Sequence, residues 1–393
     1  MQSYYIKNYY GYYILFFLLL IFSICKTLKP NNEDKYYKIF AVISSLFIIF
    51  RFDVEFDYVW YWIVGDNRFK DYWFYNYGFN ASERFFKFLY LIVRFFDSPK
   101  LFFIITGFIF SIIFFTKVKK YSKDIFLALS FYFYLNTIYI TFLIGFIRQG
   151  IAIIFSVFIM EKLLKKEYKR FVLLTFLNAI FVHKSALACL MLLPIKIFES
   201  KKIFIKCYYG IIITLAIKME WIVKNIEFLK KYTYFFKKQE TFNDLGIKVI
   251  SILFLFFIGT LLLKITFKIK LNQEEIFFYN IVLMGFLFYF ISYKLVGGHV
   301  PLRISLYFLF YFPIYFSNYL LKIKHSNILS LYLIVLLFIF GNYRAFKYSL
   351  QERENSEKRV SKQFKLMFFK DYKNLNGKYI PMNKKVNYEI RDK

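Results

Sequence analysis

Long apolar runs, repeated along most of the chain, constrain this sequence more than any other feature. Runs of roughly 14 to 20 apolar residues alternate with short lysine clusters, whereas a helix needs about 20 apolar residues to cross a bilayer core. Hydrophobic residues make up 59% of the 393 positions. Backbone amides in lipid must be satisfied within the segment, so helices are the expected form. The sequence therefore predicts an all-α, polytopic membrane protein.

The runs predict about 12 membrane-spanning helices, in a range of roughly 10 to 12. We place them at 11–27, 36–50, 101–116, 124–143, 146–161, 170–183, 185–198, 207–223, 248–263, 275–293, 303–320 and 327–343. Lysine clusters follow the first, third and fifth of these helices, and such clusters stay in the cytoplasm. The acidic stretch between the second and third helices is therefore predicted to lie outside.

The orientation of the second half depends on residues 170–198. If this stretch is two short helices hinged at 183–185, Arg303 lies at the same membrane face as Arg51 and Arg148. If 170–193 is instead one helix, every later loop changes sides, and lysine counts mildly favour that alternative. We prefer the hinge because it gathers these polar residues at one face.

Two segments are too polar to span the membrane. Within the external loop 51–100, residues Glu83–Phe96 place Glu83, Lys87 and Arg94 on one helical stripe and stop at a Pro-containing turn. This pattern predicts an amphipathic helix lying along the outer interface. The tail 344–393 is strongly polar and is predicted to be peripheral.

The composition argues against several classes of function. The net charge is +30, but Phe, Tyr and Lys are all abundant, as the amino-acid bias of an AT-rich genome would make them. We attribute the charge to basic loops that contact anionic lipid headgroups, and predict no nucleic-acid partner. The three cysteines are far apart and indicate neither a disulfide framework nor a metal site. No His-Glu-x-x-His motif is present, so we predict no metal and no cofactor.

The first group of candidate site residues follows the second predicted helix: Arg51, Asp53, Asp57, Tyr58 and Tyr61. Ionisable residues at membrane depth are costly and usually functional. If the stretch is helical, Asp53, Asp57 and Tyr61 share a face. The arginine would then bind an anion, and the carboxylates would be available as bases. The alternative is a solvated external turn with a local ion pair.

Three further groups carry charge at predicted helix ends: Arg148, the pair His183 and Lys184, and the pair Arg303 and Tyr307. Each has a plainer alternative. Arg148 would snorkel to the interface, His183 would be a satisfied structural residue, and Arg303 would belong to a basic loop. The serine after Lys184 is a poor nucleophile candidate because no Gly-x-Ser-x-Gly elbow surrounds it.

Three arginines near one membrane face, with a histidine and carboxylates, indicate a diphosphate ligand beside a proton-transfer site. Arginine cannot deprotonate and binds phosphate through a planar fork. An isoprenoid diphosphate sugar fits, because its tail needs the membrane and its diphosphate needs cations. The aromatic residues of 58–77 would wall the sugar or, as an alternative, form an interfacial aromatic belt.

The polar motifs, taken in order, resemble those of the EpsG family. They are Arg51-x-Asp53-x-x-x-Asp57-Tyr58-x-x-Tyr61, Glu83 opening an amphipathic helix, Ile147-Arg148-Gln149-x-x-Ala152, His183-Lys184-Ser185-Ala186 and Arg303-x-x-x-Tyr307. EpsG proteins are bacterial exopolysaccharide membrane proteins similar to Wzy-type O-antigen and capsule polymerases. The resemblance covers residues 1–343. The chain departs from the family in having Glu55-Phe56, where a glycine often precedes the second aspartate, and in having Gly150.

The resemblance implies a polymerase-like transmembrane domain at 1–343 with a GT-C-like architecture. Such a protein is a metal-independent glycosyltransferase, and its active site faces the periplasm from the bacterial inner membrane. Donor and acceptor are repeat units linked to undecaprenyl diphosphate, and a flippase and a chain-length regulator are further expected partners. The implied cations are Arg51, Arg148 and Arg303; the implied base is His183, Asp53 or Asp57; and Lys184, Tyr58, Tyr61, Glu83 and Tyr307 are expected at the substrate.

Rival functions remain at this point. A flippase for the same lipid-linked sugars would also carry buried arginines, but it should distribute them through the bilayer depth rather than at helix ends on one side. An O-antigen ligase would share the donor chemistry. A structural subunit would tolerate alanine at His183 and Arg148.

Overall fold

The computed structural model describes residues 10–52, 61, 83–135, 147–198, 201–225, 243–296, 299–323, 326–354 and 365–366. Within these ranges the regular secondary structure is helical apart from one pair of two-residue strands, which confirms the all-α class. The chain divides into two compact units, and each is described by itself.

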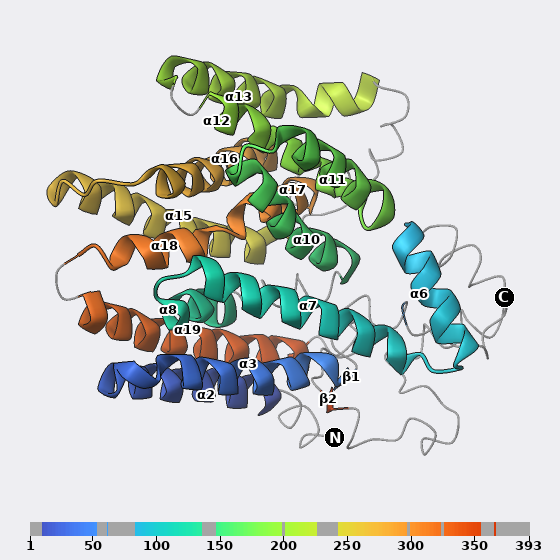
Figure 1. Ribbon diagram of the computed structural model, residues 1–393, viewed down its shortest axis with the longest axis vertical. Helices are drawn as coiled ribbons and strands as arrows, with labels where there is room; N and C mark the ends of the chain where they lie inside the picture. The colour runs from blue at the N-terminus through green and yellow to red at the C-terminus, as the bar shows by residue number, and fades with distance from the viewer. Residues whose placement is uncertain are drawn as a thin grey trace. The chain divides into compact units, whose positions relative to one another are not determined.

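The first unit comprises residues 1–116, 129–151 and 327–393. Its elements include α2 (Tyr10–Leu28), η2 (Pro30–Asn32), α3 (Glu33–Ile49), β1 (Arg51–Phe52), α6 (Arg84–Phe95), most of α7 (Lys100–Tyr121), the π-helical turn η4 (Phe131–Leu135), α19 (Ser326–Glu354) and β2 (Lys365–Leu366). Helices α2 and α3 pack against each other, with η2 as their connection (Figure 1). The strands β1 and β2 pair antiparallel, with Arg51 opposite Leu366.

Tyrosine hydroxyls and a glycine hold the helices of the first unit together. The Tyr134 hydroxyl donates to the Phe16 carbonyl on α2 at 2.6 Å, and its ring contacts Phe338 on α19. A Cβ added at Gly341 on α19 would lie 3.0 Å from the Tyr134 Cα atom. The lack of a side chain at Gly341 therefore permits the close approach of α19 to η4.

The second unit comprises residues 117–128 and 152–326. Its elements include α8 (Ile125–Ser130), most of α10 (Ile147–Leu164), α11 (Tyr168–Phe181), η5 (Lys184–Leu192), α12 (Leu193–Ile197), α13 (Lys202–Asn225), α15 (Asn243–Thr266), α16 (Gln273–Val296), α17 (His299–Leu309) and α18 (Phe312–Leu320). Helix α16 packs against α13, α17 and α18. Gly285 on α16 admits Phe308 of α17, whose Cβ would lie 2.9 Å from an added Cβ.

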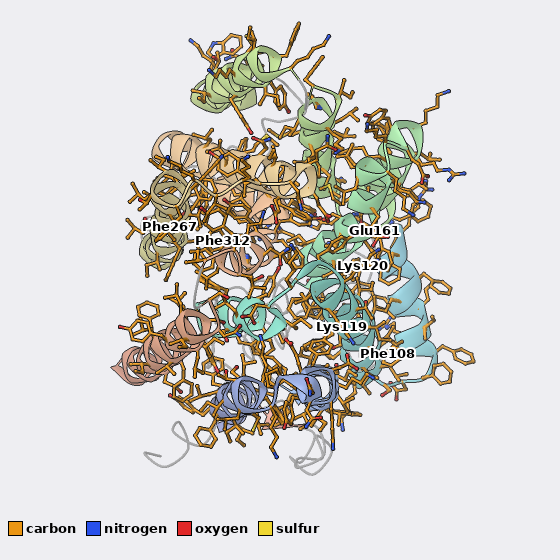
Figure 2. The ribbon with its side chains drawn as sticks, turned by 60° about the vertical axis from the view of Figure 1, so that its left-hand side comes forward. Phe108, Lys119, Lys120, Glu161, Phe267 and Phe312 are labelled. Atoms are coloured by element: carbon orange, nitrogen blue, oxygen red, sulfur yellow. The ribbon has the colours of Figure 1, made fainter. Side chains whose placement is uncertain are left out.

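Two acidic residues at helix ends gather the basic side chains of the second unit. Glu161 accepts hydrogen bonds from Lys117 at 2.5 Å, from Lys120 at 2.8 Å and from the Tyr121 hydroxyl at 2.9 Å, and Figure 2 shows it beside Lys120. Several partners offset the cost of taking the carboxylate out of water. These lysines therefore hold parts of the unit together, in addition to giving it positive charge.

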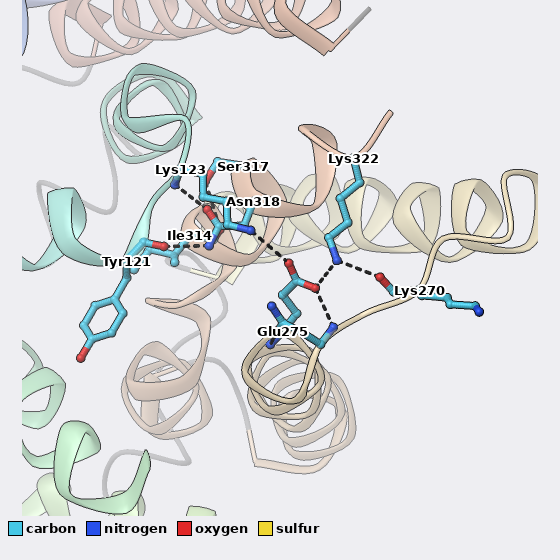
Figure 3. A network of polar contacts seen from close by, with 9 residues as sticks. Tyr121, Lys123, Lys270, Glu275, Ile314, Ser317, Asn318 and Lys322 are labelled. Atoms are coloured by element: carbon cyan, nitrogen blue, oxygen red, sulfur yellow. Dashed lines mark hydrogen bonds and ion pairs between the residues drawn. The ribbon is translucent and has the colours of Figure 1, made fainter. Parts of the chain in front are cut away.

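The second acidic centre is Glu275, near the N-terminus of α16 (Figure 3). Its carboxylate pairs with Lys322 and lies 3.6 Å from the Lys123 ammonium. Asn318 joins the same network, because its side chain accepts from the Lys123 amide at 2.7 Å and donates to the Tyr121 carbonyl at 2.7 Å. The network fixes α18 to the turn before α8.

The structure corrects the predicted helices at two places. The predicted span 303–320 begins earlier, at His299, and is divided between α17 and α18, because Pro313 has no N–H for the Leu309 carbonyl. The predicted span 185–198 is a nine-residue 3-10 helix followed by the five-residue α12. Pro194 near the start of α12 breaks the hydrogen-bond ladder in the same way.

Among the described residues, α7 is the one helix that is both long enough and apolar enough to cross a membrane. Shorter apolar helices lie at Tyr13–Leu28, Ile125–Tyr134, Ile250–Thr266 and Ser326–Asn342. The expected number of about 12 spans therefore stays a prediction.

Candidate functional site

One group of candidate residues meets in the first unit, and we call Tyr61, Glu83 and Arg148 the Arg148 cluster. Glu83 directly precedes α6 in an extended conformation, and its side chain makes no capping hydrogen bond to that helix. Its Oε2 atom instead lies 3.3 Å from Nη1 of Arg148, the second residue of α10. Arg148 also donates a hydrogen bond to the Tyr61 side chain. The cluster thus presents a partly exposed guanidinium held by an acid and a phenol.

Aromatic packing holds the Arg148 cluster in place. The Tyr61 ring stacks on Phe102 of α7 with centroids 4.8 Å apart, and Tyr90 of α6 stacks on the same ring at 5.2 Å. Helix α6 buries Phe86, Leu89, Tyr90 and Val93, which recur at helical spacing on one face. The amphipathic helix predicted at 83–96 is therefore present, and its buried face positions Glu83.

A second group meets in the second unit, and we call His183, Ser185 and Tyr307 the His183 cluster. The Nδ1 atom of His183 lies 2.6 Å from the Ser185 hydroxyl oxygen and accepts from the Ser185 backbone N–H at 3.3 Å. The Ser185 hydroxyl lies 2.9 Å from the hydroxyl of Tyr307 on α17. His183 and Ser185 are half-buried, whereas Tyr307 is fully buried.

The break in the helix that places His183 has a local cause. The Asn178 carbonyl accepts from the backbone N–H groups of both Val182 and His183, which ends α11. His183 then adopts an extended backbone (φ −162°, ψ 127°) and caps η5. The Asn178 side chain is anchored to the Ala152 carbonyl at 2.9 Å. A break in the helix is therefore present at the predicted position, while the return of the chain to the same membrane face stays a prediction.

Comparison with models of protein families assigns the chain to one family. The family model described as EpsG family matches residues 12–355, which includes both clusters. The chain belongs to the EpsG family. This family groups membrane proteins like the exopolysaccharide and Wzy-type polymerases, so the chain is a polymerase-like membrane protein of polysaccharide biosynthesis. No curated protein and no solved structure matches it.

The remaining EpsG motif residues lie on described elements or outside the described ranges. Arg303 is half-buried on α17, one turn before Tyr307 and on the same helix face. Lys184 is exposed at the start of η5. The backbone of Arg51 belongs to β1, while Asp53, Asp57 and Tyr58 lie outside the described residues. Among the described residues, no three His, Cys, Asp or Glu side chains gather as a metal site would require.

Sequence reasoning on this EpsG protein assigned no positioning role to three residues that the structure places in or beside the clusters. Ser185 was weighed only as a nucleophile, although a hydroxyl two residues after a histidine suits a local contact with the ring. Asn178 ends α11, and asparagine is common at helix ends. Tyr90 lies seven residues after Glu83 on the predicted helix, a spacing that places both on one face.

Proposed function

We propose that the chain is a polysaccharide polymerase that joins oligosaccharide repeat units carried on undecaprenyl diphosphate, in O-antigen, capsule or exopolysaccharide synthesis. The observation that carries the proposal is the EpsG family match over residues 12–355, which spans every described candidate residue of both clusters. We further propose a GT-C-like architecture in the bacterial inner membrane with the site facing the periplasm.

The proposed reaction is a metal-independent glycosyl transfer. The growing chain on undecaprenyl diphosphate is the donor, and a hydroxyl of another lipid-linked repeat unit is the acceptor. Arg51, Arg148 and Arg303 stabilise the departing diphosphate, because preorganised cations are most effective where negative charge develops. Either His183 or a carboxylate of the stretch 53–57 takes the hydroxyl proton.

The Arg148 cluster supports this assignment chemically. A guanidinium has five N–H donors, so Arg148 is able to contact Glu83, Tyr61 and a diphosphate oxygen together. The acid and the phenol then fix the plane of the fork before the ligand arrives. Preorganisation of this kind lowers the cost of binding. Glu83, Tyr61, Tyr58, Lys184 and Tyr307 complete the proposed substrate-binding set.

Deletion of the gene tests the proposal against a flippase function. Cells without a polymerase should still export single repeat units, which remain on the lipid carrier in the outer leaflet or are transferred singly by a ligase. Cells without a flippase should hold those units in the cytoplasmic leaflet. Measuring the leaflet and the length of the accumulated glycan separates the two, and glycan confined to the inner leaflet would refute the polymerase.

A further inference from the structure

The hydrogen bonds of the His183 cluster determine which ring nitrogen carries the proton. A backbone N–H is only ever a donor, and the Ser185 amide points at Nδ1 of His183 at 3.3 Å. Nδ1 therefore accepts and is unprotonated. The Ser185 hydroxyl, 2.6 Å from the same nitrogen, must then donate its own hydrogen to it.

The direction of the remaining hydrogen bond follows from this one. Because the Ser185 hydroxyl hydrogen points at His183, the Ser185 oxygen accepts from the Tyr307 hydroxyl at 2.9 Å. The three side chains form a directed chain from Tyr307 through Ser185 to His183. Tyr307 is fully buried, so the surrounding side chains hold the donor end of this series of hydrogen bonds in place.

We propose that Ser185, held by Tyr307, is a positioning residue that fixes the His183 tautomer, so that the ring presents its Nε2–H group as a donor to a diphosphate oxygen. A neutral imidazole has one N–H, and with Nδ1 accepting, that N–H lies on Nε2. The lone pair of the ring faces Ser185 and not a ligand. The inference rests on the proposed function, and it makes His183 a hydrogen-bond donor to the diphosphate and not the base.

The surroundings of His183 fit an anionic ligand better than a sugar hydroxyl. Arg303 lies one turn before Tyr307 on α17, and α17 packs against η5, which His183 caps. A neutral N–H donor and a guanidinium from one packed pair of elements both favour an oxyanion. The His183 side chain is half-buried, so it is partly exposed at the surface of the second unit.

Nitrogen-15 NMR of the full chain in lipid nanodiscs tests the tautomer directly. The chain has three histidines, so replacing His299 and His325 with glutamine leaves His183 as the single labelled imidazole. We expect an unprotonated, hydrogen-bonded Nδ1 and a protonated Nε2 at pH 7.5. A proton on Nδ1 would overturn the inference, whatever the protein polymerises.

Variants of Ser185 test the positioning role. Ser185→Ala removes the hydroxyl donor and should move the Nδ1 resonance to that of a more weakly hydrogen-bonded nitrogen, whereas Ser185→Thr keeps a hydroxyl and should restore it. Tyr307→Phe should produce a smaller shift of the same sign. An Nδ1 resonance identical in the parent and in Ser185→Ala would refute the role of Ser185.

Farnesyl diphosphate serves as the ligand probe, with farnesol as the control for its apolar tail. We expect the Nε2–H resonance to shift with farnesyl diphosphate and not with farnesol, and no shift with either would refute the donor role. In a polymerisation assay, Ser185→Ala should lower kcat about tenfold and Ser185→Thr should recover it. If the diphosphate shift is present but the parent chain forms no polymer, the proposed function fails while the donor role stands.

Discussion

At the scale of single residues, the contact between Glu83 and Arg148 gives the candidate site its first direct test. The Glu83 side chain is 10% exposed and that of Arg148 is 32% exposed, so the pair is only partly screened by solvent. Glu83→Gln keeps the shape but removes the charge, and hydrogen bonds to charged groups contribute about 1.5–3 kcal/mol. We expect polymerisation to fall at least about tenfold. Arg84→Gln, at an exposed neighbour, is the matched control, and equal activity of Glu83→Gln and parent would remove Glu83 from the site.

Replacing each candidate arginine by lysine separates charge from geometry. Arg148→Lys and Arg303→Lys keep the positive charge but lose the planar fork that binds two phosphate oxygens, so both should severely shorten the polymer. Arg51→Lys is expected to do the same. Arg170→Lys, on an exposed side chain bound to Glu167, should leave polymer length unchanged. Normal polymer in all three candidate variants, at normal expression, would refute diphosphate binding by these residues.

At the scale of elements, two helix glycines differ in what surrounds them. An added Cβ at Gly341 on α19 would meet the Tyr134 backbone at 3.0 Å, whereas one at Gly210 on α13 meets nothing within 4 Å. Gly341→Ala should destabilise the chain by about 1–3 kcal/mol through overpacking. Gly210→Ala should stabilise it by up to about 1 kcal/mol through helix propensity. Thermal unfolding in detergent measures both, and an unchanged Tm for Gly341→Ala would contradict the close approach of α19 to η4.

Helix positions were more predictable from the sequence than helix interruptions or side-chain contacts. Helices α2 and α3 begin and end within a few residues of the predicted spans, because long apolar runs define them. Hydropathy gives no indication that Pro313 divides α17 from α18, or that Lys184–Leu192 forms a 3-10 helix. Glu83 and Arg148 are 65 positions apart in the sequence. Their contact therefore depends on how the helices pack, which the local sequence pattern does not reveal.

At the scale of the whole molecule, apolar side chains face outward in both units. Large exposed examples are Phe17 (56%), Phe95 (83%), Ile203 (76%), Ile265 (75%) and Ile328 (69%). Extended apolar surface on a folded chain marks contact with a membrane or a partner. This exposure agrees with a membrane protein.

Cysteine labelling tests the predicted topology. After Cys25 and Cys207 are replaced by serine, Lys201→Cys should react only when the membrane is permeabilised, because the break at 183–185 is predicted to return the chain to the cytoplasm. Gly298→Cys should react in intact cells. The reverse pattern would show that the loops of the second half lie on the opposite sides, and it would separate Arg303 from the outer face.

The two faces of α6 give the Arg148 cluster a mechanical connection to its surroundings. Phe88 and Phe95 are exposed, while Glu83, the residue that precedes the helix, reaches the guanidinium. If α6 lies along the bilayer interface, as the sequence predicts, lipid packing acts on those rings, and Glu83 and the Tyr90–Phe102–Tyr61 stack connect the helix with Arg148. The rate of the proposed polymerisation should therefore depend on acyl-chain length in reconstituted vesicles, and substituting alanine for both phenylalanines should weaken that dependence.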